Sequence, residues 1–191
     1  MKKMSGWAIF GIIFAIIVII FGSWGVGSYN GLVGLKEKVD NQSANIEVQL
    51  QRRVDLIPNL VSTVKGYTSH ESEILTQIAN ARAKLAGATT MTDKASADTE
   101  LSGALSRLLV VVENYPNLKA DTQFTALTDE LAGTENRIAV ARKDYNDIVT
   151  SYNSKIKIFP ANIVANIFGF ASADYFKASS ASTETPTVSF S

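Results

Sequence analysis

The stretch "DTQFTALTDELAGTENRIAVARKDYNDIVTSYNSKIKI", residues 121–158, decides the fold class of this chain of 191 residues. Residues spaced alternately by three and four positions form a stripe along it, in which Thr134, Ala141 and Lys155 are the weak members. The other members are Phe124, Leu127, Leu131, Ile138, Tyr145, Ile148, Tyr152 and, just beyond the stretch, Phe159. This heptad repeat predicts one long helix with a single apolar face. Such a helix cannot bury its face alone, so it needs antiparallel helical partners.

A similar stripe earlier in the chain predicts the partner helix. It comprises Leu32, Leu35, Val39, Ile46, Leu50, Val54, Ile57, Val61 and Val64, and the pattern continues through Ile74, Ile78 and Leu85. The small, polar residues 87–96 predict a loop, residues 97–113 a further helix, and residues 114–121 a turn. Apart from the last few residues, no stretch alternates with the period of two that strands show. We therefore predict an all-α fold: an N-terminal transmembrane helix followed by an elongated, antiparallel, coiled-coil-like three- or four-helix bundle.

The N-terminal region contains the membrane anchor. Residues 7–27, "WAIFGIIFAIIVIIFGSWGVG", carry no charge and are long enough to cross a bilayer as a helix. Trp7 and Trp24 lie near its ends, where indole rings favour the membrane interface. The opening "MKKM" would also suit a cleaved signal peptide, but the apolar run is long for one and no A-x-A-like site follows it. We therefore expect a retained single-pass anchor, preceded by a short flank, residues 1–6.

The charges beside the anchor favour one orientation. Lys2, Lys3 and the amino group precede the span, whereas Lys36 and Lys38 follow it at a greater distance with acidic residues nearby. The positive-inside rule then places the N-terminus in the cytoplasm and the bundle outside it, in the periplasm or at the cell exterior.

The C-terminal region has two parts. The stretch "FPANIVANIFGF", residues 159–170, is apolar but too short to span a bilayer. It either caps the bundle or lies in the membrane interface. Residues 178–191 are rich in Ser and Thr, and we expect them to be disordered.

Composition excludes several classes of function. Lys+Arg and Asp+Glu both number 18, so the chain lacks the basic footprint of a nucleic-acid-binding protein. The absence of Cys excludes disulfides, thiolate nucleophiles and Cys-ligated zinc, and a single His excludes a His-rich metal site within one chain. The sequence thus indicates no cofactor, no metal, no nucleic-acid partner and no enzyme activity.

The stretch "RRVDLIPNLVSTVKGYTSHE", residues 52–71, is a candidate interaction site. Pro58 removes a backbone donor, which predicts a kink or a restarted helix capped by Asp55, and the apolar stripe that continues across it favours the kink. Gly66 stands inside the helical pattern and predicts close approach by a neighbouring backbone. His70 is a candidate general base or half of an intermolecular metal site, but no nucleophile or further ligand stands at a recognisable spacing, which favours a structural role. The other members of this candidate surface are Asn59, Lys65, Tyr67 and Glu71.

A second candidate stretch is "TENRIAVARKDYNDIV", residues 134–149. Arg137 is expected to meet Asp55 or Glu71 on the facing helix, as an ion pair or polar layer that sets the register of the two helices. The other residues singled out here are Asn136, Arg142, Tyr145 and Asn146.

The chain resembles the LemA family of bacterial membrane proteins in six stretches. These are "YNGLVGLKEKVDN" (29–41), residues 52–71 quoted above, "YPNLKAD" (115–121), "TENRIAVARKDYNDIVTSYN" (134–153), "FPANIVA" (159–165) and "GFASADYF" (169–176). The resemblance implies a membrane-anchored helical bundle over residues 29–177, with no particular activity and no catalytic residues. It also implies an N-terminus outside the cytoplasm, opposite to what the charges favour. LemA-like domains also occur in proteins of magnetosome membranes, which implies membrane organisation as a theme.

Two functions are therefore compatible with the sequence. The first is a non-enzymatic, membrane-anchored scaffold of the bacterial cell envelope, which forms homo-oligomers and organises or shapes the membrane. The alternative is an adaptor, which docks a protein partner such as a membrane protease or sensor kinase through residues 52–71.

Overall fold

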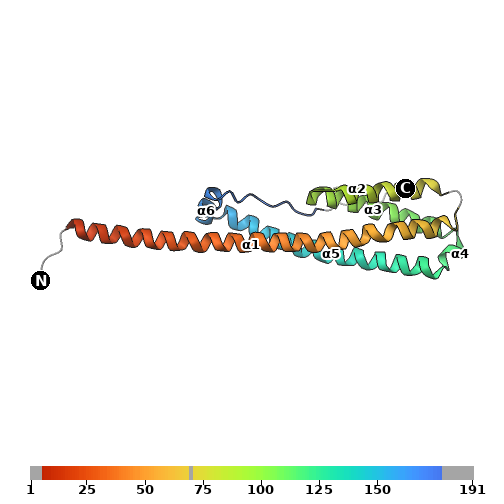
Figure 1. The fold of residues 1–191 in the computed structure, drawn as a ribbon, viewed down its shortest axis with the longest axis horizontal. Helices are drawn as coiled ribbons and strands as arrows, with labels where there is room; N and C mark the ends of the chain where they lie inside the picture. The colour runs from red at the N-terminus through yellow and green to blue at the C-terminus, as the bar shows by residue number, and fades with distance from the viewer. Residues whose placement is uncertain (1–5, 69–70, 178–191) are drawn as a thin grey trace, which may run out of the picture. The chain divides into compact units, whose positions relative to one another are not determined.

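The computed structural model describes residues 6–68 and 71–177, and every regular element in these ranges is a helix (Figure 1). The helices are α1 (Gly6–Lys65), α2 (Ser72–Gly87), α3 (Met91–Val112), α4 (Pro116–Lys119), α5 (Thr122–Lys157) and α6 (Ala161–Ile167). Within these ranges α1, α2, α3 and α5 are the long helices, and α4 and α6 are short. The predicted all-α helical bundle is confirmed.

The chain divides into two compact units. The first contains α1 as far as Asp40 together with Ile148–Ala173, and the second contains Asn41–Asp147 with the described residues from Asp174 onward. Helices α1 and α5 contribute to both units.

The second unit is an antiparallel bundle with an aliphatic core. Arg52 of α1 pairs with Glu130 of α5 at 2.7 Å, and Tyr67, beyond the end of α1, binds Asp121, just before α5, at 2.8 Å. Residue numbers therefore rise along α1 as they fall along α5, which makes these two helices antiparallel. The largest fully buried aliphatic side chains of this unit are Ile46, Ile57, Leu60, Ile78, Leu101, Leu108, Leu118 and Val64.

The predicted stripe of α5 holds at Phe124, Leu131, Ile138, Tyr145 and Tyr152, which are all buried. Near its end the stripe moves by one residue. The predicted members Lys155 and Phe159 are exposed, and Val149 and Ile156 are buried in place of Ile148 and Lys155. A straight helix has 3.6 residues per turn, so a strict heptad stripe rotates by about 20° per heptad. Over four to five heptads this rotation amounts to about one residue position.

The predicted loop at 87–96 is too long. Helix α2 ends at Gly87 and α3 begins at Met91, so only three residues, 88–90, connect them. Thr90 caps α3, because its hydroxyl accepts a hydrogen bond from the amide of Asp93 at 3.0 Å. The small residues Ala95 and Ala97 are buried, so residues that resembled a loop form the close-packed first turns of a helix. The predicted turn at 114–121 likewise contains the short helix α4.

Helix α1 runs without interruption through Pro58, so of the two predicted alternatives, a kink or a restarted helix, the restart is wrong. It ends at Lys65, and Gly66 belongs to the following turn and not to a helix. The stripe beyond Gly66 belongs to a separate helix, α2.

In the first unit, α6 directs its small side chains inward. Ala161, Val164 and Ala165 are buried. Gly169 ends the segment with φ +73°, and the amide of Phe170 donates to the carbonyl of Ala165 at 2.9 Å, as in a Schellman motif. A left-handed conformation of this kind favours glycine. The turn places the rings of Phe168 and Phe170 against Tyr29, with centroids 4.7 and 5.8 Å apart.

Helix α1 is the one helix in the described ranges that is long and apolar enough to cross a membrane. Its most apolar window has a mean hydropathy of 2.6, and none of this window is buried within the protein. A core helix of a soluble protein would bury such a surface. The tail that we expect to be disordered, residues 178–191, lies outside the described residues.

Candidate functional site

Pro58 lies inside α1 and leaves the carbonyl of Val54 without the amide that would normally bind it. Nε of Arg82, from α2, donates to this carbonyl at 2.9 Å. Arg82 is half-buried, so the bond is partly shielded from water. The helix continues through Pro58 with a donor supplied by its neighbour. Sequence reasoning missed Arg82, because nothing in the pattern of α2 distinguishes it.

Asp55 does not cap a helix, contrary to prediction. It is exposed and accepts a hydrogen bond from Nε2 of Gln51 at 2.8 Å. Asn59 is exposed next to Pro58, and its carbonyl accepts from the Thr63 hydroxyl at 3.0 Å.

Lys65 and Gly66 are exposed at the end of α1. The amide of Gly66 donates to the carbonyl of Thr63 at 3.1 Å and so begins the turn. Among the described atoms, only this same carbonyl would come within 4 Å of a Cβ at position 66, at 3.3 Å. The predicted close approach of a neighbouring backbone is therefore wrong.

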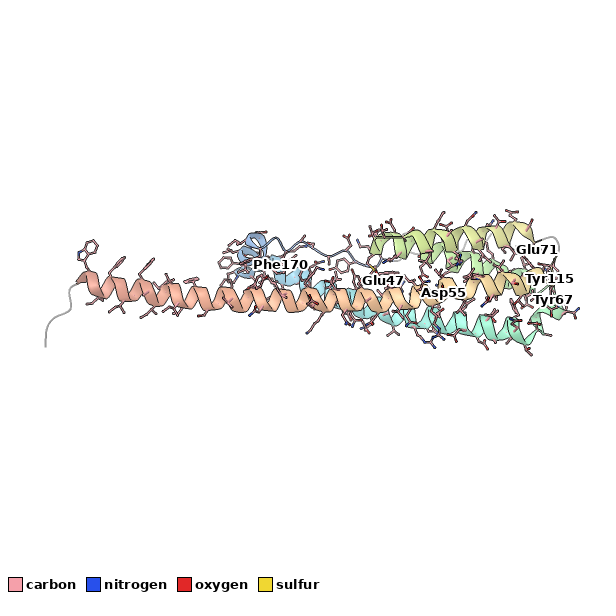
Figure 2. The ribbon with its side chains drawn as sticks, in the orientation of Figure 1. Glu47, Asp55, Tyr67, Glu71, Tyr115 and Phe170 are labelled. Atoms are coloured by element: carbon pink, nitrogen blue, oxygen red, sulfur yellow. The ribbon has the colours of Figure 1, made fainter. Side chains whose placement is uncertain are left out.

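Two tyrosine–carboxylate hydrogen bonds link the turns at one end of the second unit, where Figure 2 shows Tyr67, Glu71 and Tyr115 together. Tyr67, after α1, donates to Oδ2 of Asp121 at 2.8 Å, and Tyr115, after α3, donates to Oε1 of Glu71 at 2.9 Å. Each of the two turns thus supplies one tyrosine and one carboxylate. His70, which directly precedes Glu71 in the sequence, lies outside the described residues.

Asp121 also begins α5, because its Oδ1 accepts the amide of Phe124 at 2.8 Å. This amide, and after it the hydroxyl of Tyr67, lowers the pKa of Asp121. The hydrogen bond to Asp121 raises the pKa of Tyr67, and the hydrogen bond to Glu71 raises that of Tyr115. Both bonds therefore favour neutral phenols, and the bond from Tyr67 also favours the ionised form of Asp121.

Arg53 is the central buried charge of the second unit and is 3% exposed. Its Nη1 lies 2.7 Å from Oδ1 of Asp98 and 2.5 Å from Oε2 of Glu135, and its Nη2 donates to Oγ of Ser102 at 2.9 Å. The Ser102 hydroxyl in turn donates to Glu135 at 3.2 Å. One guanidinium thus connects α1, α3 and α5.

Burial raises the pKa of Asp98, an effect that the charge of Arg53 opposes and that of Glu135 reinforces. Sequence reasoning missed this cluster, although a signal was present. Arg53 stands seven residues after Ile46 and seven before Leu60, both buried, so it occupies a core position of the heptad. A charge at such a position needs buried partners on the neighbouring helices.

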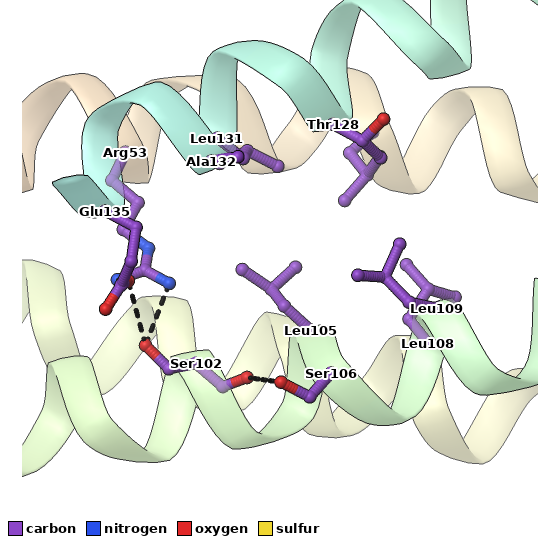
Figure 3. Close-up of a pocket in the computed structure, with 11 residues that line it drawn as sticks. Arg53, Ser102, Leu105, Ser106, Leu108, Leu109, Thr128, Leu131, Ala132 and Glu135 are labelled. Carbon is purple, nitrogen blue, oxygen red and sulfur yellow. Dashed lines mark hydrogen bonds and ion pairs between the residues drawn. The ribbon is translucent and has the colours of Figure 1, made fainter.

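A groove with a volume of about 300 Å³ lies beside this cluster and between α3 and α5 (Figure 3). Arg53 and Glu135 stand at one end of it. Nε of Arg53 is buried and has no hydrogen-bond partner among the described residues. The groove therefore places an apolar wall beside a buried polar cluster. The wall is formed by Leu60, Leu105, Leu108, Leu109 and Leu131.

The predicted pairing of Arg137 with Asp55 or Glu71 is wrong. Arg137 is exposed and lies 3.4 Å from Oε1 of Glu130 on its own helix. The same Glu130 oxygen binds Arg52 of α1 at 2.7 Å, so Arg52 makes the interhelical contact expected of Arg137.

In the second unit, Tyr145 and Asn146 bind the extended C-terminal segment, residues 171–177. The Tyr145 hydroxyl donates to the carbonyl of Asp174 at 2.7 Å. The Asn146 amide accepts the N–H of Phe176 at 2.9 Å and donates to the carbonyl of the same residue at 3.0 Å. The two other residues singled out in this stretch lie elsewhere on α5, Asn136 exposed and Arg142 half-buried.

In the first unit, Tyr152 and Asn153 repeat this arrangement. The Tyr152 hydroxyl donates to the carbonyl of Ala171 at 2.8 Å, and Asn153 both accepts from and donates to Ala173 at 2.9 Å. The spacing has a geometric cause. Seven helical residues rise about 10.5 Å, and three extended residues cover about 10 Å. Tyr-Asn pairs that stand seven residues apart on the helix therefore bind residues that stand three apart on the extended segment.

These features define a class of protein: a helical bundle that continues from one exposed apolar helix, with a C-terminal segment bound by a ladder of Tyr-Asn pairs. The sequence model of the LemA family matches residues 42–190, so the chain belongs to the LemA family of membrane-associated proteins. The quoted stretches from 52 onward all lie within the match, and 29–41 precedes it.

Three relatives illustrate the similarity. Protein LemA of Metamycoplasma hominis is 30% identical over 172 residues, which cover 89% of this chain and 78% of the relative. Magnetosome protein MamQ 1 of Paramagnetospirillum magneticum is 29% identical over 175 residues, and Magnetosome protein MamQ of Magnetospirillum gryphiswaldense is 27% identical over 174. Both alignments cover 78% of this chain and only 64% of the magnetosome proteins.

Proposed function

We propose that the protein is a non-enzymatic scaffold of the bacterial cell envelope, which α1 anchors in the membrane and which associates with copies of itself. One exposed apolar helix supports anchoring. The magnetosome names of two relatives support membrane organisation as its purpose. The charge count beside the anchor supports a bundle outside the cytoplasm.

The groove between α3 and α5 is the observation that carries self-association. Its leucine wall continues onto exposed side chains of α3, where Leu109 is half-exposed and Val110 is 72% exposed. An apolar helix face from a second copy would cover this wall. The charged groups at the groove already bind one another, so the groove offers a docking surface and not a set of reactive groups.

The test is the mass of the full-length protein in mild detergent and in nanodiscs, measured by size exclusion with light scattering. We expect an oligomer that Leu109→Asp with Val110→Asp converts to monomer without loss of helicity. Val48→Asp is the matched control, because Val48 is 62% exposed on α1 and does not line the groove. A monomeric wild-type protein would contradict the scaffold. If Val48→Asp dissociated the oligomer as fully as Leu109→Asp with Val110→Asp, the groove would not be the surface of self-association.

The adaptor remains the second candidate because one exposed surface favours it. Pro58, Asn59, Lys65 and Tyr67 are all exposed at the same end of α1. Photo-crosslinking from position 59 in membranes, with position 48 as control, separates the candidates. An adduct with a membrane protease or sensor kinase only at position 59 supports the adaptor, and adducts only with a second copy of the chain contradict it.

A further inference from the structure

The segment from the end of α5 through α6 exposes a group of large apolar side chains in the first unit. They lie within eleven consecutive positions, although isolated exposed apolar residues are the norm on soluble surfaces. The group comprises Ile158, Phe159, Ile163, Ile167 and Phe168.

The outer surface of α6 carries an apolar side. Ile163 and Ile167 are four residues apart and share this side of the helix, Asn166 beside them is exposed, and Asn162 is half-buried. Ala161 and Val164 are on the buried side. A short helix with a packed side and an exposed apolar side is suited to the boundary between water and hydrocarbon.

The position of α6 matches the level at which α1 leaves a bilayer. Phe168 and Phe170 contact Tyr29, which follows the uncharged run 7–27 by two residues. Two helical residues correspond to about 3 Å along α1. Both elements belong to the same compact unit, and the contact with Tyr29 places Phe168 beside the end of the exposed apolar run of α1.

The charge of this segment fits an anionic membrane surface. Residues 148–173 contain two lysines, Lys155 and Lys157, and no Asp or Glu. Both lysines are exposed in the last turn of α5, directly before Ile158. Each lysine near an anionic leaflet strengthens binding, because phospholipid phosphates attract it.

We propose that residues 158–168 lie in the interface of the bilayer that α1 crosses. Ile163, Ile167 and Phe168 insert among the acyl chains, and Lys155 and Lys157 bind anionic headgroups. The partner of this surface is the lipid itself. The inference rests on the membrane anchoring in the proposed function, but not on self-association. It gives α6 the role of fixing the first unit against the membrane surface.

The absence of Cys allows single cysteines to carry an environment-sensitive fluorophore on the full-length protein. The probe positions are Ile17→Cys within the apolar run, Ile167→Cys on α6 and Val48→Cys as a control. Val48 stands 21 residues beyond Gly27 on the same helix, about 32 Å from the end of the run. Nanodiscs contain phosphatidylcholine with or without phosphatidylglycerol, and lipids with a quencher on the acyl chain report insertion.

We expect quenching and a blue shift at positions 17 and 167 and neither at position 48. Lys155→Gln with Lys157→Gln should abolish any extra quenching at position 167 that phosphatidylglycerol causes. Quenching at 17 without quenching at 167 would overturn the inference and leave the anchor intact. No quenching at 17 would overturn the anchor and with it both proposals. A blue shift at 167 without lipid quenching, together with disulfides between two copies at this position, would mean that a second copy covers α6 and would also overturn the inference.

Discussion

Nε of Arg82 donates to the carbonyl of Val54 at 2.9 Å and so replaces the amide that Pro58 lacks. The contact joins α2 to α1 at the one proline inside α1. It explains how a residue that usually breaks a helix is tolerated in the middle of a bundle.

Arg82→Met should lower the free energy of unfolding by about 1–3 kcal/mol, because it leaves a partly buried carbonyl unpaired. In a Pro58→Ala background the restored amide binds Val54, so the same substitution should cost much less. A double-mutant cycle by chemical denaturation of the full-length protein in detergent measures both costs. Lys84→Met, which removes only an exposed pair with Glu100, is the control on the same helix. Equal costs in both backgrounds would contradict this account.

Arg53→Met should destabilise the protein by about 3–5 kcal/mol, because Asp98 would remain buried without its counter-charge. The neighbouring Arg52→Met removes an exposed arginine and should cost less than about 1 kcal/mol. Denaturation curves of the two variants compare a buried and an exposed arginine one position apart. Adding Asp98→Asn to Arg53→Met should recover part of the loss, and the account fails if it does not.

The dependence of stability on pH should have opposite signs at two aspartates. Burial holds the pKa of Asp98 above 3.8, so its contribution is fully present below 3.8 and is lost as pH rises through the folded-state pKa. The pKa of Asp121 is lowered, so its contribution is present above 3.8 and is lost as pH falls through the folded-state pKa. As pH rises above 3.8, the wild-type protein should therefore lose stability relative to the Asp98→Asn variant. As pH falls below 3.8, it should lose stability relative to the Asp121→Asn variant. Two slopes of the same sign would contradict the assignment.

Tyr67→Phe should lower the melting temperature near neutral pH, because it removes one of the hydrogen bonds that favour ionised Asp121. In an Asp121→Asn background the effect should be smaller. Thermal unfolding followed by circular dichroism measures both changes. An unchanged melting temperature would show that Tyr67 has no structural role and would favour its use in partner binding.

Asn153→Asp should release the C-terminal segment, because a carboxylate accepts from the amide of Ala173 but cannot donate to its carbonyl. We expect faster hydrogen exchange over residues 171–177 and a loss of about 1–3 kcal/mol in stability. Asn136→Asp, at an exposed position of the same helix, is the control and should change neither. Unchanged exchange in Asn153→Asp would mean that the Tyr-Asn ladder does not hold the segment.

Much of the fold was predictable because helical periodicity is local. The spacing of apolar residues predicted α5 to within a residue or two, and the uncharged run 7–27 predicted the apolar part of α1. Predictions failed where local composition and tertiary contact disagree. Residues 91–96 look like a loop, but they form the first turns of α3, because a Thr90 cap and buried alanines stabilise them there.

The candidate site was predictable only in part. Tyr145, Asn146, Tyr67 and Glu71 were singled out by motif, but the segments that they bind could not be named, because those segments lie 29 to 54 residues away in the chain. The charged heptad position of Arg53 signalled a buried cluster without identifying Asp98 or Glu135.

By itself, the sequence determined the helical class, the apolar run of α1 and the faces that must be buried, since side-chain spacing and hydropathy act within each helix. Only the tertiary structure decided which donor satisfies the carbonyl freed by Pro58, which carboxylates neutralise Arg53 and which backbone the Tyr-Asn pairs bind. Those choices depend on which segments lie alongside one another, because a buried polar group must find its partner within hydrogen-bond distance wherever the chain places one.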